Sequence, residues 1–285
     1  MTAARLLHLS DTHLLGGGAL HQGLVDTTAV LRRLLASLAG IGPLDAVVVS
    51  GDVSDDGSPE SYATARDLVG GFAAQRGAQV VWAVGNHDVR GPFARVLLDG
   101  ADAGGPLDAV HDVGGLRVVV LDSSVPGRGY GELRPAQLAR LREVLAAPAP
   151  RGSVVVVHHP PLPAPTVLHE ALRLQEPDAL LAAVAGTDVR AVLSGHYHHP
   201  YVATAGGLTL VVAPGVANRT DVLVPHGLER AVRGSGACLV EVGPDGVRAT
   251  VLTVAAPGDG EELFVLDEET VARIAAEYGT AGGSA

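Results

Sequence analysis

The sequence predicts an α/β fold, with an α+β-like antiparallel part, in which two mixed β-sheets pack face to face between helices as four layers, α/β/β/α. Three observations support this prediction. Short β-branched runs alternate with amphipathic stretches up to residue 194. Beyond residue 194, a glycine pair and a Pro-Asp-Gly turn separate strand-like segments. Hydrophobic residues make up 47% of the 285-residue chain and aromatic residues only 3%, so we expect an aliphatic core.

The part of the chain before residue 194 alternates between expected strands and helices. Apolar residues such as Leu31, Leu34 and Leu38 recur at helical spacing, and Ser58 before Pro59 is typical of a helix start. A hairpin is expected around Gly114-Gly115, from residues 109–113 and 116–121. The other expected strands are residues 5–10, 45–50, 79–84, 153–157 and 189–194, and the expected helices are 26–38, 59–75, 92–98, 135–145 and 176–184.

The later part of the chain predicts antiparallel hairpins. Residues 201–204 and 208–212 flank Gly206-Gly207, and residues 237–242 and 247–254 flank Pro244-Asp245-Gly246. We expect one large domain over residues 1–256 and a C-terminal extension over 257–285. The extension should hold a helix at 267–278 that packs on the body, followed by a disordered tail, 279–285.

The charge of the chain disfavours nucleic acid as a partner. The formal net charge is −11, and all 20 basic residues are arginine. Binding to a nucleic-acid polymer depends on clustered basic side chains that neutralise phosphates. A small anionic substrate is still compatible with this charge, because bound metal ions reverse the sign locally.

The single cysteine, Cys238, excludes an internal disulfide and suits a reducing compartment. We expect it to be a small buried side chain. The N-terminus lacks a basic segment followed by an apolar one, and no apolar run reaches the length of about 20 residues that a membrane span requires. The prediction is therefore a cytoplasmic protein without a membrane span.

Metal-binding residue types follow five strand-like segments at the point where each ends. Ligands gather outside the carboxyl ends of strands in open α/β sheets, so these five loops are expected to meet at one edge. An isolated Asp in such a place is more often a turn or helix-capping residue, but five occurrences in register favour a metal site. The residues are Asp11 and His13, Asp52, Asn86 with His87, His158 with His159, and His196 with His198.

The ligand types indicate which ions the site would hold. Carboxylate, imidazole and amide groups without thiolate suit Mn, Fe, Zn or Co as divalent or trivalent ions. Two such ions about 3.5–4 Å apart can polarise a phosphoryl group and hold a bridging hydroxide that attacks in line.

The ordered motifs D-x-H, GD, GNHD, H and GHxH resemble those of the calcineurin-like metallophosphoesterase superfamily. Within it, the stretches HLSDTHLLGG, GDVSDDG, HHPPLP and GTDVRAVLSGHYH look most similar to bacterial class III 3′,5′-cyclic-nucleotide phosphodiesterases, over residues 5 to 254. The resemblance implies a metallophosphoesterase sandwich, a dinuclear phosphodiesterase acting on small diesters such as cAMP, and a homodimer.

The resemblance also implies roles for single residues. Asp11, His13 and His198 would bind the first ion, Asn86, His158 and His196 the second, and Asp52 would bridge the two. His87 would assist the reaction as a histidine beside the phosphate, oriented by Asp55 of the GDxxD motif. Asn86 and His87 are expected to contact substrate, and His159 is expected either to contact substrate or to support the ligands from behind.

One departure from the motif of related phosphatases narrows the range of expected substrates. Protein Ser/Thr phosphatases of this superfamily have GDxxDRG, whereas this chain has Asp56 in place of that arginine. A monoester dianion would benefit from the arginine more than a diester monoanion. The alternatives left open are a glycerophosphodiesterase or broad-specificity phosphodiesterase with the same site, a non-catalytic scaffold and a nuclease. His21 and His169 are expected to be solvent-facing loop residues, and Tyr197 to pack or hydrogen-bond.

Overall fold

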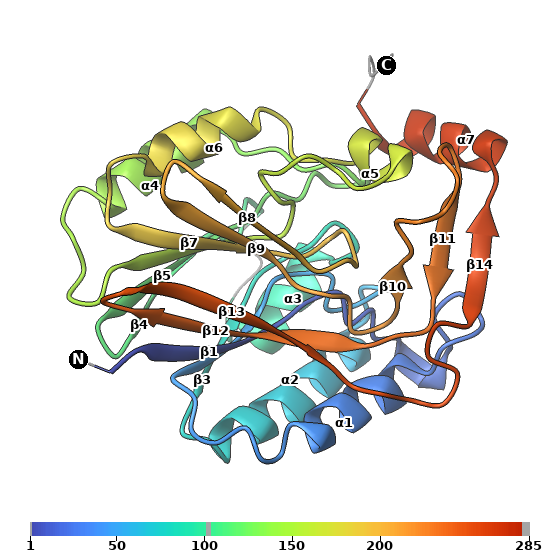
Figure 1. Cartoon of the computed structure of the whole chain (residues 1–285), viewed down its shortest axis with the longest axis horizontal. Helices are drawn as coiled ribbons and strands as arrows, with labels where there is room; N and C mark the ends of the chain where they lie inside the picture. Colours follow the sequence, from blue (N-terminus) through green and yellow to red (C-terminus); the bar gives the residue numbers. More distant parts are fainter. Residues whose placement is uncertain (1, 101–103, 281–285) are drawn as a thin grey trace.

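Two mixed β-sheets form the centre of the molecule, and helices cover both outer faces (Figure 1). The computed structural model describes residues 2–100 and 104–280. The five-stranded sheet has the order β13 (Gly246–Thr253), β12 (Gly236–Gly243), β1 (Ala4–Leu9), β2 (Ala46–Val49) and β3 (Gln79–Trp82). The six-stranded sheet has the order β4 (Ala109–Val113), β5 (Leu116–Leu121), β6 (Ser153–Val157), β7 (Val189–Ser194), β9 (Leu208–Val212) and β8 (Tyr201–Ala205).

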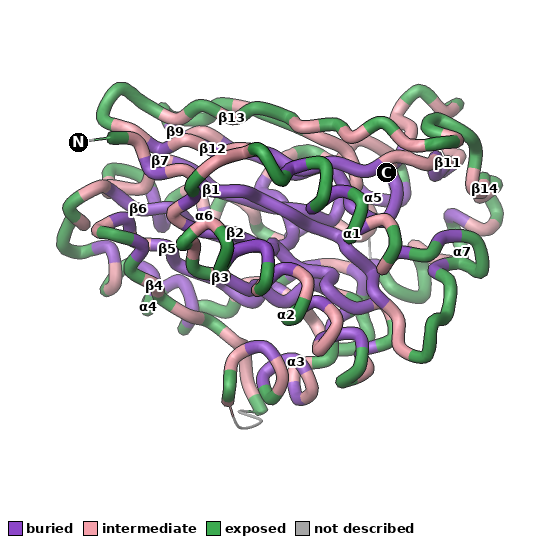
Figure 2. The backbone as a smooth tube through the Cα atoms, turned by 90° about the horizontal axis from the view of Figure 1, so that it is seen from below, coloured by how far each residue is buried: buried purple, intermediate pink, exposed green. Residues whose placement is uncertain are grey.

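Alternating side chains of the central strands build separate apolar layers. Leu6 of β1 lies in the core between the sheets, whereas Leu7 and Leu9 face the helices. The helices on this side are α1 (Thr27–Ser37), α2 (Pro59–Ala74) and α3 (Arg90–Leu97). Those on the six-stranded sheet are α4 (Pro135–Val144) and α6 (Pro177–Val184). The predicted four-layer fold is confirmed, and the most deeply buried backbone runs through the central strands (Figure 2).

Parallel pairing places the functional loops at one edge. Strand β1 pairs in parallel with β2, and β2 with β3. In the other sheet β5, β6, β7 and β9 are parallel neighbours. The carboxyl ends of these strands therefore point the same way within each sheet, which is the arrangement that a shared ligand site requires.

Side chains cap the starts of α1 and α2, and the cap at Ser58 was predicted. The Asp26 carboxylate accepts the Ala29 N–H at 2.9 Å, and the Ser58 hydroxyl accepts the Ser61 N–H at 3.2 Å. Both helices begin at the next residue, Thr27 and Pro59. Within residues 2–100 and 104–280, no helix combines the length and apolar character that crossing a bilayer requires.

The sequence pattern did not predict a small third sheet or a short helix. The sheet consists of β10 (Arg219–Thr220), β11 (Glu229–Val232) and β14 (Glu262–Leu266), and the helix is α5 (Val167–Ala171). These elements span at most five residues each, too few for a periodic signal. The terminal helix α7 (Glu268–Tyr278) was predicted, and its Val271 is buried. Most of the predicted disordered tail, 281–285, lies outside the described residues.

Candidate dinuclear metal centre

The backbone is strained at five of the predicted metal ligands. Asp11, His13, Asp52, His196 and His198 have positive φ, between 41° and 70°. They make up five of the eight non-glycine residues with positive φ in the described part of the chain. This conformation is uncommon for side-chain-bearing residues, and it persists only where the surrounding structure enforces it. Its concentration at the strand ends indicates that the loops are shaped to aim these side chains.

Glycines in the same loops leave room for the ligands. Gly51 has φ of +110°, and a Cβ there would collide with the His158 ring. A Cβ on Gly85 would collide with the Asp52 carboxylate. Gly51 therefore provides both the turn and the space, whereas Gly85 provides the space.

The first half-site consists of Asp11, His13 and His198. The Nδ1 of His13 donates to the Asp55 carboxylate at 3.0 Å, and the Nδ1 of His198 donates to the Asn218 carbonyl at 3.3 Å. Each ring therefore has an unprotonated Nε2, because burial lowers the pKa of both histidines to about 4. These two Nε2 atoms lie 3.1 Å apart. Two lone pairs at this separation repel unless a cation lies between them.

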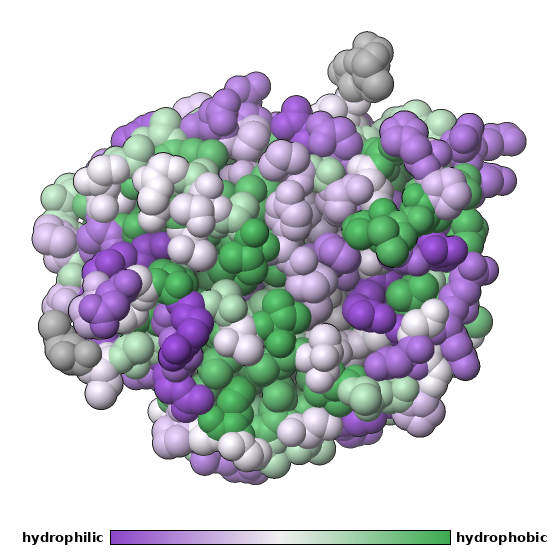
Figure 3. Space-filling view, in the orientation of Figure 1, coloured by the Kyte–Doolittle hydropathy of each residue, from purple (hydrophilic) through white to green (hydrophobic). Residues whose placement is uncertain are grey.

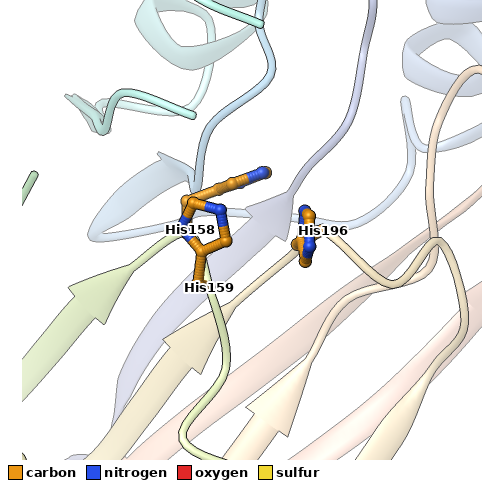
Figure 4. Close-up of side chains that lie close together, drawn as sticks. All are labelled: His158, His159 and His196. Atoms are coloured by element: carbon orange, nitrogen blue, oxygen red, sulfur yellow. The ribbon is translucent and has the colours of Figure 1, made fainter. Parts of the chain in front are cut away.

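The second half-site consists of Asn86, His158 and His196. The Nδ1 of His158 donates to the Ser50 carbonyl at 2.8 Å, and its Nε2 faces the Asn86 Oδ1 at 3.1 Å. The Nε2 of His196 donates to the Leu172 carbonyl at 3.0 Å, so its Nδ1 carries the lone pair. His158 follows β6 and His196 follows β7, and both rings stand at the strand ends (Figure 4).

Asp52 lies between the two half-sites. Its Oδ2 is 3.7 Å from the His13 Nε2 and 3.3 Å from the His158 Nε2. Burial alone would raise the pKa of Asp52, but His158 and His87 hold it well below its usual value. Burial likewise opposes a charge on His158, whose pKa Asp52 nevertheless raises to about 9. A proton or a metal ion at this point would satisfy both groups, and the two compete for it.

The donor set fits two metal ions. Two groups, Asp11–His13–His198 and Asp11–Asp52–His158, each offer ligand atoms within 4.8 Å of one another. All of these donors are nitrogen or oxygen, and the outer nitrogen of each imidazole in the two half-sites has a carboxylate or carbonyl partner. Metal-binding histidines in proteins are oriented in this way.

Asp55 is shared by three histidines. Its carboxylate hydrogen-bonds to the Nδ1 atoms of His13 at 3.0 Å and His21 at 3.1 Å, and it forms an ion pair with the Nδ1 of His87 at 3.2 Å. The His87 side chain is 42% exposed, which leaves its Nε2 accessible from outside. Asp88, in contrast, accepts backbone N–H groups from Val53, Ser54 and Gly85 and so holds the loops together.

His159, for which a substrate contact and a place behind the ligands were both expected, is enclosed by the protein. His159 is fully buried. Its Nδ1 hydrogen-bonds to the Ser123 hydroxyl at 2.8 Å and its Nε2 donates to the Gly129 carbonyl at 3.1 Å. The ring lies against His196, with centroids 4.5 Å apart (Figure 4). With neither nitrogen free, His159 packs behind the second half-site.

Several partners of the site were missed by sequence reasoning. His21 was expected to face solvent, but it is buried and bonded to Asp55. His169 was also expected to face solvent, but it is buried with its ring 5.7 Å from that of His196. The carbonyls of Ser50, Leu172 and Asn218 carry no sequence signal, since every residue has one. Tyr197 packs and hydrogen-bonds as expected, to the Leu162 carbonyl.

Comparisons with known proteins agree with this geometry. The family model described as calcineurin-like phosphoesterase matches residues 4–200. A cAMP/cGMP dual specificity phosphodiesterase from Mycobacterium tuberculosis is 44% identical over 261 residues, 90% of this chain and 81% of that protein. A probable cyclic nucleotide phosphodiesterase from Rhodococcus erythropolis is 40% identical, over 90% of this chain and 88% of that protein.

A solved structure supports the fold independently. A dimetal phosphatase from Danio rerio, 16% identical, superimposes with a TM-score of 0.60 over 90% of this chain and all of that one. The match of the family model over more than half of the chain, together with relatives at 40–44% identity, establishes the family. The chain belongs to the calcineurin-like phosphoesterase family.

Proposed function

We propose that this protein is a metal-dependent phosphodiesterase that hydrolyses 3′,5′-cyclic nucleotides such as cAMP. The observation that carries the proposal is the convergence of the His13, His198 and His158 Nε2 atoms around the Asp52 carboxylate. The relatives at 40–44% identity, a cAMP/cGMP phosphodiesterase and a probable cyclic nucleotide phosphodiesterase, support the substrate class.

The ligand roles follow from the half-sites. Asp11, His13 and His198 would hold one ion, Asn86, His158 and His196 the other, and Asp52 both. When bound, the two ions would polarise the phosphoryl group and lower the pKa of a water molecule. Mn, Fe, Zn and Co all suit this donor set.

We assign to His87 the role of protonating the leaving oxygen. Burial alone would lower its pKa, but the carboxylates of Asp52 and Asp55 raise it to about 9. Its Nδ1 forms an ion pair with Asp55 at 3.2 Å. In this role the protonated ring would donate a proton from Nε2 to the substrate.

Asp56, which stands in place of the phosphatase arginine, supports a diester as the substrate. Asp56 accepts the N–H groups of Gly16 at 2.8 Å and Ser58 at 3.0 Å, so it holds the Gly16–Gly18 turn against the start of α2. This position therefore supplies no cation for the second charge of a monoester, whereas a diester carries a single charge at neutral pH.

Two further properties belong to the same proposal. We infer a homodimer from the family resemblance, which sedimentation of the purified protein would test. We infer the cytoplasm as the location because Cys238 is the only cysteine and is buried, so no internal disulfide needs an oxidising compartment.

The proposal is tested by hydrolysis of 3′,5′-cyclic AMP with Mn²⁺ supplied, beside an aryl phosphodiester and glycerophosphocholine. Efficient turnover of cyclic AMP that is lost in Asn86→Ala would support the cyclic-nucleotide function. Turnover of another diester with little turnover of cyclic AMP would overturn the proposed substrate class and leave the proposed two-metal site intact. No hydrolysis of any diester by metal-loaded protein would overturn the enzyme function itself.

A further inference from the structure

The C-terminal helix α7 ends against the loop formed by residues 125–131. The Gly129 N–H donates to the Tyr278 carbonyl at 2.9 Å, and the Arg128 guanidinium donates to the Glu277 carbonyl at 2.7 Å. Carbonyls at the end of a helix lack partners within it, and a cation there also complements the helix dipole. The inner side of α7 buries Val271, and its outer surface is mainly hydrophilic (Figure 3).

The same end of α7 also packs on α5, which lies beside it (Figure 1). A Cβ on Gly279 would lie 2.9 Å from the Ala171 carbonyl oxygen, at the end of α5. A Cβ on Gly129 would lie 2.9 Å from a methyl group of Leu172 and 3.5 Å from the Cβ of Tyr278. Gly129 is therefore enclosed between α7 and the residue that follows α5.

Both segments that α7 contacts also contact the second half-site. The Leu172 carbonyl accepts the proton on the His196 Nε2 at 3.0 Å, which fixes the Nδ1 lone pair toward the site. The Gly129 carbonyl accepts from the His159 Nε2 at 3.1 Å. The His159 ring in turn lies 4.5 Å from that of His196 and 5.0 Å from that of His158. Two short routes thus lead from α7 to the same pair of proposed ligands.

The first half-site is connected to α7 by a longer route. Strand β14, which precedes α7, pairs with β11, and β11 pairs with β10, which directly follows Asn218. The orientation of His13 depends on Asp55, and that of His198 depends on the Asn218 carbonyl. Among the contacts of the described residues, the C-terminal end of α7 packs on α5 and bonds to the 125–131 loop, whereas Glu268 at its start adjoins Gly227. The C-terminal end of α7 therefore lies behind the second half-site.

We propose that α7 is a positioning element for the second metal ion, through Gly129 and Leu172. The proposal rests on the dinuclear site proposed above. It assigns a role in metal binding to the predicted C-terminal extension, 257–285. Displacing α7 should lower the affinity for the ion held by Asn86, His158 and His196. The affinity for the other ion should be unchanged.

Gly129→Ala is the sharpest test, because Gly129 lacks a positive φ and the added methyl group acts only by contact. Mn²⁺ binding to the full chain would be measured by equilibrium dialysis, with electron paramagnetic resonance to distinguish a coupled pair from a single ion. We expect the second ion to bind about 10-fold more weakly, in the range for partners of metal ligands. Gly70→Ala, at a helical position with open space around it, is the matched control and should bind both ions normally.

Arg128→Ala covers the case in which Gly129→Ala fails to fold, since Arg128 lies at the surface. It should give a smaller loss confined to the second ion, with partial recovery in Arg128→Lys. Arg140→Ala, which removes an exposed arginine paired with Glu143 on α4, is its control.

A double-mutant cycle identifies the half-site that is affected. Gly129→Ala should cause little further loss of Mn²⁺ in an Asn86→Ala background, but an additive loss in a His13→Ala background. Equal weakening of both ions, or normal binding in both the Gly129 and Arg128 variants, would overturn the proposal. Two-ion binding by a wild-type protein that does not hydrolyse cyclic AMP would refute the proposed substrate and leave this inference intact.

Discussion

The two half-sites differ in what orients their histidines. In the first, His13 donates to a carboxylate, Asp55, which increases the basicity of the ligand nitrogen. In the second, His158 and His196 donate to the backbone carbonyls of Ser50 and Leu172. A side-chain substitution can therefore remove the group that orients His13, although His198 depends on the Asn218 carbonyl. The groups that orient His158 and His196 can be changed only by moving the backbone, which makes these two rings dependent on the packing of the loops behind them.

The largest effect is expected from Asp52→Ala, which tests whether both metal ions depend on the same carboxylate. Asp52→Ala removes the one carboxylate that lies within 3.7 Å of both His13 and His158. We expect both ions to bind more weakly and kcat/KM to fall by about 10³-fold or more, because metal ions supply several kcal/mol of transition-state stabilisation. Activity and Mn²⁺ stoichiometry measure this, with exposed Asp67→Ala as control. Unchanged binding of one ion would show that Asp52 serves a single half-site.

The next effect separates chemistry from metal binding. His87→Ala should lower kcat by about 10²-fold, typical for loss of a general acid, because His87 forms an ion pair with Asp55 but belongs to neither half-site. Both Mn²⁺ ions should remain bound. A steady-state assay beside metal analysis checks this. Loss of an ion in this variant would instead make His87 part of the first half-site.

Asp55→Asn tests whether the carboxylate that orients His13 matters for only one of the two ions. We expect the first ion to bind about 10-fold more weakly, because His13 loses the charge that orients it, and the second ion to be unchanged. Titration with Mn²⁺ measures the two affinities. Selective weakening of the second ion would reverse the assignment of the half-sites.

The smallest effect concerns a histidine behind the site. Burial lowers the pKa of His8 from 6.5 to about 3, so the unfolded chain binds a proton there that the folded chain does not. The contribution of neutral His8 is complete above pH 6.5 and is lost as the pH falls toward 3, by about 1.4 kcal/mol per pH unit at most. The free energy of unfolding of the wild type minus that of His8→Gln should therefore decrease as the pH falls. If this difference in the free energy of unfolding did not change with pH, the pKa of His8 would be the same in the folded and unfolded chain.

The sequence was sufficient for the two large sheets because each strand has an apolar run and each major helix has periodic apolar residues. The spacing of Asp11, Asp52 and His158 at strand ends predicted that they would meet, since parallel strands share one edge. The sequence could not place His21 or the Leu172 carbonyl, because tertiary packing of loops brings them to the site. The two-residue strand β10 was not predicted for the same reason, because no local sequence pattern indicates its pairing with β11.

The positive φ angles at Asp11, His13, Asp52, His196 and His198 have a thermodynamic consequence. The unfavourable backbone conformations are adopted when the sheets form, so the ligands from separate loops are already gathered before an ion arrives. The metal centre is therefore preorganised, and little conformational entropy is lost on binding. Since ions that bind only the folded state stabilise it by mass action, the supply of metal becomes a determinant of how much folded protein persists.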